Sequence, residues 1–570
     1  MRGRRGWERR LAERSAAVVA AAAPGRRIPD LSVLPPLLAD SGAFSTLRER
    51  LSITGRGRHV GLTSVPHGAK TYLAAALSIV AGERICWIAR DAEIGDRVAE
   101  ELAAWVGDPS AVAVLEPRTA LAYERSELVA DETAARVAAL SAWRSGRAAI
   151  LVASVQALLQ HTLRPEDLPA EPRTLRVGSR VGQAALMAEL LELGYDPVLE
   201  VAGKGEVARR GGLVDVFPPS AGLPIRIELF GDEVESLRRF DPTDQRSVGR
   251  ADEVVLLPAS EFLLPSGGAE LRERLAGALH AAGRLPERLA ADLERMAGPA
   301  GSAPGADRTP SRAARTGSRA ADVEDAAEVW APLLAPATGL DHVAADAVLV
   351  LDEPGDVAEA AAFLWRQADE RRDELVQAGE LPRDWPATIL GPRPWKARLL
   401  GARTLELTWE SEVAREAAIA GGGTSSGDLF GWREPTLPPG RAQRIGEAVE
   451  LWRGGQGGAA TRVEAGPGRA RAGSGEGTPH RIVITSDQAP RLAELLEEAG
   501  VATGVTDVLT EPPPPGAVAL VDRSLNGGFE GGPDGLVFVT DRELFANVRV
   551  RRPKAMRRVV PRDILERLTP

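Results

Sequence analysis

The chain has 570 residues, of which 44% are hydrophobic and only 4% aromatic, and its net charge is −10. A chain of this length is expected to form roughly three or four domains. Its negative charge excludes a protein that coats nucleic acid with its whole surface. The single cysteine, Cys86, excludes an intrachain disulfide, and the six scattered histidines show no metal-ligand spacing. We therefore expect a cytoplasmic protein without a metal site.

Residues 1–27 are rich in arginine and then in alanine. The alanine run at 16–23 has two interpretations, a short signal-peptide core or a frayed amphipathic helix. Glu8 and Glu13 interrupt the basic region and favour the helix. No stretch reaches the roughly 18 apolar residues needed to span a membrane. We treat 1–27 as an N-terminal extension and expect no membrane contact.

Short apolar runs alternate with helical patterns over residues 28–170. The expected strands and helices follow one another as strand 59–63, helix 71–80, strand 84–90, helix 93–106, strand 112–115, helix 131–144 and strand 149–154. Such alternation is typical of a parallel sheet covered by helices. The sequence therefore predicts a first α/β domain.

Residues 171–265 have a different sequence pattern, with many β-branched residues and frequent turn-forming residues. Aliphatic residues at 225, 227 and 229 alternate with Arg226, Glu228 and Phe230, and period 2 places Arg226 and Glu228 on one face of a strand and the three aliphatic residues on the other. Gly231 and Asp232 supply a tight turn into the next strand. We predict a small, largely β domain here.

The α/β pattern returns over residues 266–418, with a buried strand at 347–351 and a long helix at 357–377. The Gly/Ala/Arg/Pro-rich insert 298–319 is expected to be disordered. The remaining segments are predicted to be Gly-rich linkers around a short helical segment at 419–480, a small α/β domain at 481–545 and a basic connector at 546–570.

The strand at 59–63 is followed by a segment with the spacing of a phosphate-binding loop, at 64–71. Lys70 and Thr71 stand where such a loop needs its lysine and its Mg²⁺-binding hydroxyl, with Gly68 close before them. The lysine of this motif reaches the terminal phosphates of a nucleotide. This segment is a candidate nucleotide loop.

The glycines of such a loop are missing. Ser64 and Ala69 replace the two glycines that let backbone N–H groups close around phosphates, and Pro66 removes a further N–H. We interpret the loop as degenerate and expect no nucleotide turnover.

Asp352 and Glu353 follow the predicted strand at 347–351. A strand that ends in Asp-Glu is where an ATPase places its Mg²⁺ ligand and its water-activating carboxylate. Such pairs are also common as loop-capping acids, so the pair alone leaves both interpretations open. Its order after the degenerate loop favours a remnant of that ATPase motif.

The segment 205–219 and the strand that carries Arg226 and Glu228 contain no nucleophile, base or metal-ligand set. An exposed strand face that bears Arg and Glu beside an aromatic suits recognition of a protein partner. A solvated sheet face without a partner remains an equal alternative on these residues. The basic run at 549–558 likewise allows either weak, nonspecific phosphate contact with DNA or a solvated connector.

The segments 205–219, 224–238 and 257–262 resemble the domain 2 signature shared by UvrB and the transcription-repair coupling factor (Mfd) family. The resemblance implies a helicase-lobe-like, P-loop NTPase-like domain formed by 28–170 and 266–418, with the β-rich domain inserted and a small C-terminal α/β domain after it. In both families domain 2 binds UvrA. The positions that match the family's contacts are Arg210, Phe217, Arg226 and Glu228.

Two features make the chain more similar to the Mfd family than to UvrB. The nucleotide loop is decayed, and the segment 115–136 is too short for UvrB's DNA-probing hairpin, with Tyr123 as its only aromatic. One departure from the family pattern is Asp196-Pro197, which follows Tyr195 where some members have an arginine.

The resemblance implies a UvrA-recruiting module of transcription-coupled nucleotide excision repair, without the polymerase-interacting and translocase domains that follow in the family. RNA polymerase, ATP and Mg²⁺ would then be bound by those further domains, and none is expected here. The alternatives are a UvrB-type ATP-dependent helicase subunit and an inert fragment of a gene.

Overall fold

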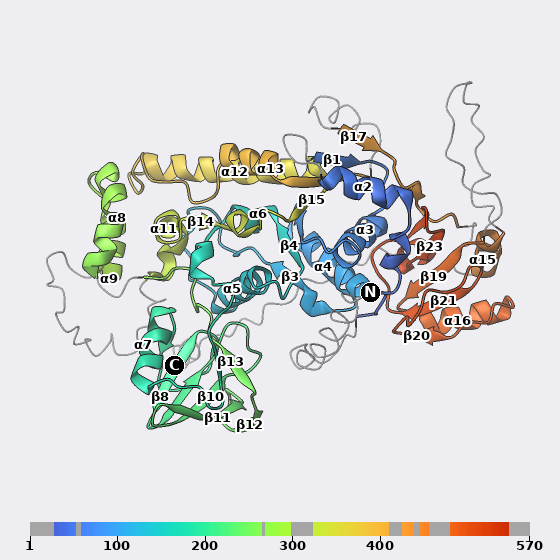
Figure 1. Ribbon diagram of the computed structural model, residues 1–570. Helices are drawn as coiled ribbons and strands as arrows, with labels where there is room; N and C mark the ends of the chain where they lie inside the picture. The colour runs from blue at the N-terminus through green and yellow to red at the C-terminus, as the bar shows by residue number, and fades with distance from the viewer. Residues whose placement is uncertain are drawn as a thin grey trace, which may run out of the picture.

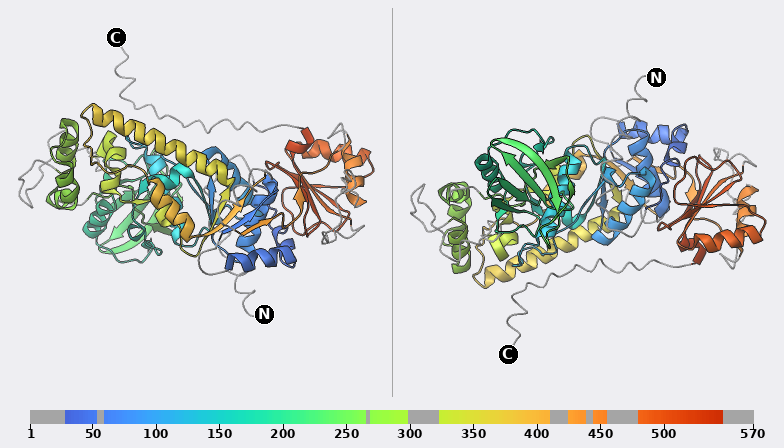
Figure 2. Two further views of the ribbon diagram at one scale, coloured as in Figure 1. Left: turned by 90° about the horizontal axis from the view of Figure 1, so that it is seen from above. Right: turned by 90° about the horizontal axis from the view of Figure 1, so that it is seen from below.

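The computed structural model describes residues 28–52, 59–264, 268–297, 323–409, 424–437, 444–454 and 479–545. A seven-stranded sheet and two six-stranded sheets organise these residues (Figure 1). The β-rich domain and the C-terminal unit lie well apart, with the seven-stranded sheet between them (Figure 2). The multidomain α/β class is therefore confirmed. The predictions for 1–27, 298–319 and 546–570 fall outside the described residues.

The seven-stranded sheet is parallel throughout and runs in the order β17-β1-β16-β15-β2-β4-β3. Strands from both sides of the β-rich domain alternate within it, as expected for one domain with an insertion. The strands are β1 (His59–Leu62), β2 (Ile85–Ala89), β3 (Val112–Leu115), β4 (Ile150–Ser154), β15 (Val348–Asp352), β16 (Arg403–Leu407) and β17 (Thr424–Gly427).

Each face of this sheet has its own apolar core. Ile85 and Trp87 of β2 point to one face, and Cys86 and Ile88 point to the other. Strands buried on both faces read as continuous apolar runs, which is the pattern of the predicted strands. The first face is covered by α2 (Gly42–Ser52), α3 (His67–Ile79) and α4 (Ala92–Val106). The second is covered by α5 (Ala130–Arg144), α6 (Val155–Leu159), α12 (Pro354–Gln377) and α13 (Pro392–Gly401).

A third core lies beside the second face. It contains α8 (Gly268–Ala282), α9 (Glu287–Ala297) and α11 (Ala327–Leu334). Tyr123 is buried in this core, so the aromatic of the segment 115–136 serves packing here. A short ladder of β5 (His161–Thr162) with β14 (Ala337–Thr338) lies close by.

The β-rich domain is a six-stranded sheet in the order β12-β11-β10-β9-β8-β7. One face packs on α7 (Gln183–Glu192) and on the short ladder of β6 (Thr174–Arg176) with β13 (Glu253–Val255). The sheet strands are β7 (Asp196–Pro197), β8 (Glu206–Arg210), β9 (Leu213–Val216), β10 (Ile225–Phe230), β11 (Glu233–Phe240) and β12 (Ser247–Arg250). The predicted hairpin is confirmed, with Phe230 opposite Glu233 across the turn.

Buried ion pairs fix the β-rich domain to the first domain. Glu261, at the end of the β-rich domain, accepts hydrogen bonds from Arg118 and Arg136, each at 2.9 Å. Arg118 also pairs with Glu328 of α11. Two cations and two anions balance one another in an interior that would not hold a lone charge. They therefore tie Glu261 and α11 to the first domain.

The C-terminal unit is larger than the predicted 481–545 domain. Its strands are β18 (Trp432–Arg433), β19 (Arg481–Ser486), β20 (Val505–Thr506), β21 (Val518–Asp522), β22 (Phe529–Gly531) and β23 (Leu536–Val539). Its helices are α15 (Ile445–Arg453), α16 (Ala489–Glu498) and α17 (Asp541–Phe545).

Within 419–480 the predicted short helical segment is present as α15, but two stretches that were predicted to be linkers form the strands β17 and β18. The segment supplies β17 to the first sheet, and β18 and α15 to the C-terminal unit. Phe430 and Trp432 are buried, with stacked rings 4.2 Å apart. The strands β17 and β18 are short and lie between glycine-rich stretches, so the sequence was interpreted as linker there.

Aromatic side chains join the C-terminal unit to the first domain. The ring centroids of Tyr72 (α3) and Phe529 lie 5.2 Å apart, and those of Trp105 (α4) and Phe538 lie 4.8 Å apart. Residues of both units belong to one continuous apolar core. The C-terminal unit therefore packs directly beside the loop that leads into α3.

Candidate functional site

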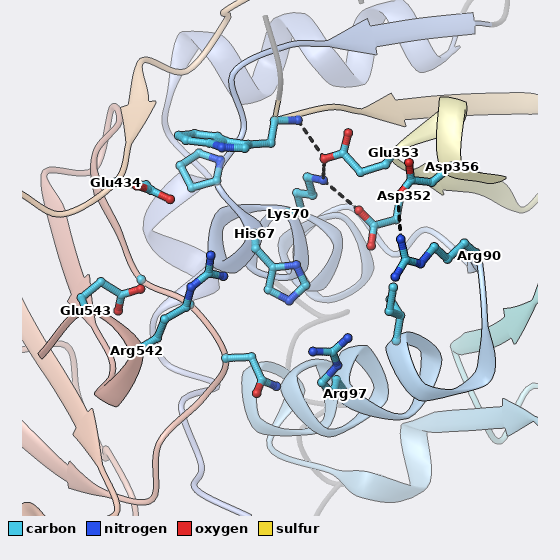
Figure 3. A pocket seen from close by; sticks show the side chains of 16 residues that line it. His67, Lys70, Arg90, Arg97, Asp352, Glu353, Asp356, Glu434, Arg542 and Glu543 are labelled. Atoms are coloured by element: carbon cyan, nitrogen blue, oxygen red, sulfur yellow. Dashed lines mark hydrogen bonds and ion pairs between the residues drawn. The ribbon is translucent and has the colours of Figure 1, made fainter. Parts of the chain in front are cut away.

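The degenerate loop and the Asp-Glu pair meet in one cavity of about 490 Å³ between the first domain and the C-terminal unit. Lys70 comes from the first turn of α3, and Asp352 and Glu353 from the end of β15 (Figure 3). The structure thus brings together residues that lie 282 positions apart in the chain.

The Lys70 centre, which we define as Lys70, Asp352 and Glu353, is closed on itself. The Lys70 side chain is only 2% exposed, and its ammonium donates to Asp352 Oδ1 at 2.8 Å and to Glu353 Oε1. Two carboxylates therefore surround the amine that a nucleotide loop would offer to phosphate. A triphosphate would have to displace both of them, so these residues do not fit that ligand.

The backbone of the loop is also closed. The amides of Ala69 and Lys70 donate to the Pro66 carbonyl at 2.9 and 3.1 Å, so they are not free for a phosphate. Ser64 keeps φ at 61°, a left-handed conformation that favours glycine. The loop thus keeps the left-handed backbone bend at Ser64, the position where an intact loop has its first glycine. The amides of Ala69 and Lys70 are hydrogen-bonded within the loop.

Thr71 is fully buried and does not face the cavity. Its hydroxyl donates to Glu101 Oε2 at 2.8 Å and accepts from the Trp105 indole at 3.1 Å. Glu101 also pairs with His67 at 3.2 Å. The hydroxyl that would bind Mg²⁺ in an intact loop is therefore part of the packing between α3 and α4.

Burial alone would lower the pKa of His67, but the Glu101 carboxylate outweighs it and raises that pKa above its ordinary 6.5. Burial alone would likewise raise the pKa of Glu101, but His67, Thr71 and Asn526 lower it. Each of the two groups therefore favours the charged form of the other, where α3 packs against α4.

The C-terminal unit covers the start of α3. A Cβ added to Gly68 would lie 2.0 Å from the Gly527 carbonyl oxygen, so no larger residue fits at position 68. Gly527 and Gly528 line the same cavity as Lys70. This cover could not be predicted from the sequence, because Gly68 and Gly527 are more than 450 residues apart.

Other charged side chains around the cavity were not singled out from the sequence. Arg90 pairs with Asp356 at 3.2 Å, and Glu543 accepts from the Thr540 amide and hydroxyl. The guanidinium groups of Arg97 and Arg542 also lie at the cavity (Figure 3). Among the residues with described positions, no group of three or more His, Cys, Asp or Glu side chains could hold a metal ion.

The second candidate site is the outer face of the β-rich sheet, opposite the face that packs on α7. The register places Arg210, Leu213 and Glu228 in one cross-strand row, and Asp215 and Arg226 in the next. Cross-strand neighbours point to the same side of a sheet. The predicted positions 210, 226 and 228 therefore lie together on this outer face, as alternation implied for Arg226 and Glu228 and the family resemblance implied for Arg210.

The predicted exposure of Arg226 is wrong. Its guanidinium makes two hydrogen bonds of 2.8 Å to the buried carboxylate of Asp215 and lies 4.7 Å from the centre of the Phe240 ring. Arg226 is only partly exposed, and it neutralises a carboxylate that water cannot reach. It therefore supports the sheet as well as lining its face.

Phe217 is not the aromatic of this face. It is 7% exposed and packs with Phe240 and Val201 in a small core at one end of the sheet. The exposed aromatic is Phe230, at 79% exposure, with Leu199 also strongly exposed. Phe230 was not singled out from the sequence, although it follows Glu228 by two positions in the alternating segment 225–230.

Arg210 is exposed at the end of β8. Its guanidinium donates to Glu200 at 2.8 Å and to the Leu199 carbonyl at 3.0 Å. Glu228 accepts from the Ser236 hydroxyl at 2.8 Å. Arg210, Glu228 and Phe230, which we call the docking face, thus combine both charges with an open aromatic.

Comparisons with known proteins bear on the same segment. Residues 174–262 match the family model of the UvrB interaction domain, which spans the six-stranded sheet just described. The chain carries a UvrB interaction domain. The resemblance drawn above from residues 205–262 is thereby confirmed.

The chain is also similar to transcription-repair-coupling factors. It is 28% identical over 538 residues to the protein of Myxococcus xanthus, which covers 88% of this chain and 40% of that relative. It is 34% identical over 254 residues to the Mycobacterium bovis protein, with 42% of this chain and 20% of the relative covered. The Bacillus subtilis protein is 28% identical over 280 residues, with 48% and 23% covered. The chain therefore spans between about a fifth and two fifths of the length of these relatives.

No helix in the described ranges is both long and apolar enough to cross a membrane.

Proposed function

We propose that this chain recruits UvrA in transcription-coupled nucleotide excision repair, and that the docking face is the surface that binds it. The observation that carries the proposal is an exposed face with Arg210, Glu228 and Phe230 inside a UvrB interaction domain. The names of the similar transcription-repair-coupling factors support the repair pathway.

The chemistry of the docking face suits a protein partner. Interfaces are enriched in aromatic and arginine side chains, which act as anchors when they become desolvated. Phe230 is a large apolar group that the folded chain leaves in water. Arg210 is held by an exposed ion pair with Glu200 and a hydrogen bond to the Leu199 carbonyl, and exposed contacts of this kind contribute little to folding.

We also propose that the chain hydrolyses no ATP. The Lys70 ammonium is neutralised by Asp352 and Glu353, the Thr71 hydroxyl is buried, and Gly527 covers the start of α3. Each feature removes one group that an ATPase loop must present to nucleotide and Mg²⁺. These contacts argue against a UvrB-type ATP-dependent helicase.

Calorimetric titration of the full chain with purified UvrA tests the recruitment proposal. Wild-type chain should bind, and Arg210→Ala should weaken binding by more than about tenfold, because loss of a charge partner that is desolvated in a complex typically costs about 2–5 kcal/mol. Arg393→Ala, which removes an exposed arginine of α13, is the matched control and should bind as wild type does. Absence of wild-type binding would refute the proposal.

A phosphate-release assay tests the second proposal. The chain, with or without duplex DNA, should release phosphate from ATP no faster than the Lys70→Ala variant does. DNA-stimulated release that Lys70→Ala abolishes would show an active nucleotide loop.

A further inference from the structure

A row of arginines continues the outer face of the β-rich sheet to its free edge. Arg226 of β10 is paired in register with Arg238 of β11, and Arg238 with Arg250 of β12. Residues paired in this way point to one side of the sheet, with Cβ atoms about 4.5–5.5 Å apart. The edge arginines, Arg238 and Arg250, therefore stand side by side next to the docking face.

The folded chain does not neutralise the edge arginines. Both are exposed, and among the described residues neither side chain has a hydrogen bond or an ion pair, whereas Arg226 is satisfied by Asp215. The nearby Asp241 and Asp244 accept the backbone amides of Thr243 and Arg246. Like charges directly opposite one another destabilise a sheet. The two like charges therefore destabilise the sheet slightly, and an anionic group bound beside them would remove this repulsion.

The strand that carries Arg250 also has an open edge. β12 pairs only with β11, and all four of its residues are exposed, including Val248. An open strand edge offers unpaired backbone groups to an extended segment of another chain. Positive side chains and a free edge thus occur on the same strand, continuous with the docking face.

We propose that an acidic, extended segment of the docked partner protein lies along β12 and places its carboxylates over Arg238 and Arg250. This inference rests on the proposed function, since the same partner occupies the docking face. A protein segment suits the surface better than nucleic acid does, because Glu228 and the exposed Phe230 share this face. Carboxylates repel phosphates, whereas mixed charges around an aromatic are typical of protein interfaces.

The test compares two variants that each lose two exposed arginines. Arg238→Ala/Arg250→Ala removes the edge arginines. Arg366→Ala/Arg393→Ala removes the same charge from α12 and α13, where neither arginine has a described partner. Association of UvrA with each full-length chain is followed by stopped-flow fluorescence and calorimetry at low and high salt.

The edge variant should bind UvrA roughly three- to tenfold more weakly than wild type at low salt, mainly through slower association. High salt should shrink this difference, because salt screens exposed charges. The control variant should match wild type at both salt concentrations. The edge variant should also melt at the same or a slightly higher temperature, since it loses a like-charge contact.

Equal UvrA binding by the edge and control variants, with Arg210→Ala still weakened, would overturn this inference and leave the recruitment proposal standing. Absence of wild-type binding would overturn both. Loss of duplex DNA binding in the edge variant with unchanged UvrA binding would assign the arginine pair to phosphates instead, and would also overturn it.

Discussion

The Lys70 centre and the docking face both contain a basic and an acidic side chain, but they differ in burial. The charges of the Lys70 centre are largely buried and paired with one another, whereas Arg210 of the docking face is exposed. In the Lys70 centre a buried cation is surrounded by Asp352 and Glu353 of the same chain. On the docking face Arg210 and Phe230 lie in water. A motif read from residue types and spacing cannot distinguish these cases, because burial and pairing decide whether a charged group can receive a partner.

The difference has an energetic basis. A buried charge loses its hydration, and short hydrogen bonds to its partners must offset this desolvation free energy. Releasing Lys70 to a ligand would leave Asp352, which is nearly buried, without its cation. An exposed arginine carries no such penalty, so it can exchange water or a weak ion pair for a partner's carboxylate. Lys70 is therefore tied to carboxylates of its own chain, whereas Arg210 can exchange its partner.

The largest effect is expected from Lys70→Ala. Removing one partner of a buried ion pair typically costs about 3–5 kcal/mol, because the other charge is left uncompensated. The free energy of unfolding, measured by urea denaturation, should fall by that amount. A variant that also carries Asp352→Leu and Glu353→Leu should recover part of the loss. A Lys70→Ala chain as stable as wild type would show that the centre is open.

Arg226→Ala should have an intermediate effect. Asp215 is buried and would lose its two hydrogen bonds from Arg226, at a cost of about 1–3 kcal/mol. Arg210→Ala serves as the control and should change the free energy of unfolding by less than about 1 kcal/mol. Equal stability of the two variants in urea denaturation would place Arg226 with the exposed charges.

A smaller, pH-dependent effect is expected from His67. Because Glu101 raises the pKa of His67 in the folded chain, protonated His67 stabilises the fold below the unfolded value of about 6.5. This stabilisation is lost as the pH rises through the higher folded pKa. Glu101 stays ionised in that window, since its own pKa is lowered.

The measurement is the difference in free energy of unfolding between wild type and His67→Gln, followed from about pH 6 to pH 9. It should decline as the pH rises. A difference that grows toward high pH would contradict the assignment of the His67–Glu101 pair.

Much of the fold follows from local patterns in the sequence. The strands near 59, 85, 112, 150 and 348 are continuous apolar runs, and the strand at 225–230 has a period of two and leads into a Gly-Asp turn. Such signals depend only on neighbouring residues. The meeting of Lys70 with Asp352 was likewise anticipated from the order of the two motifs.

What the sequence could not predict depends on distant segments. Trp432 lies in a short apolar stretch between glycine-rich segments, and it forms a strand only because the C-terminal sheet pairs with it. Phe217 and Phe230 are both strand-end aromatics. Only the segments near Val201 and Phe240 decide which of the two is buried.

Side-chain footprinting with hydroxyl radicals, read by mass spectrometry, tests the central claim most directly. Phe230 and Phe363 are both exposed in the free chain, at 79% and 55%, on the docking face and on α12 respectively. Addition of UvrA should strongly reduce the oxidation of Phe230 and leave Phe363 unchanged. Unchanged oxidation of Phe230 in a chain that demonstrably binds UvrA would contradict the account and place the partner elsewhere.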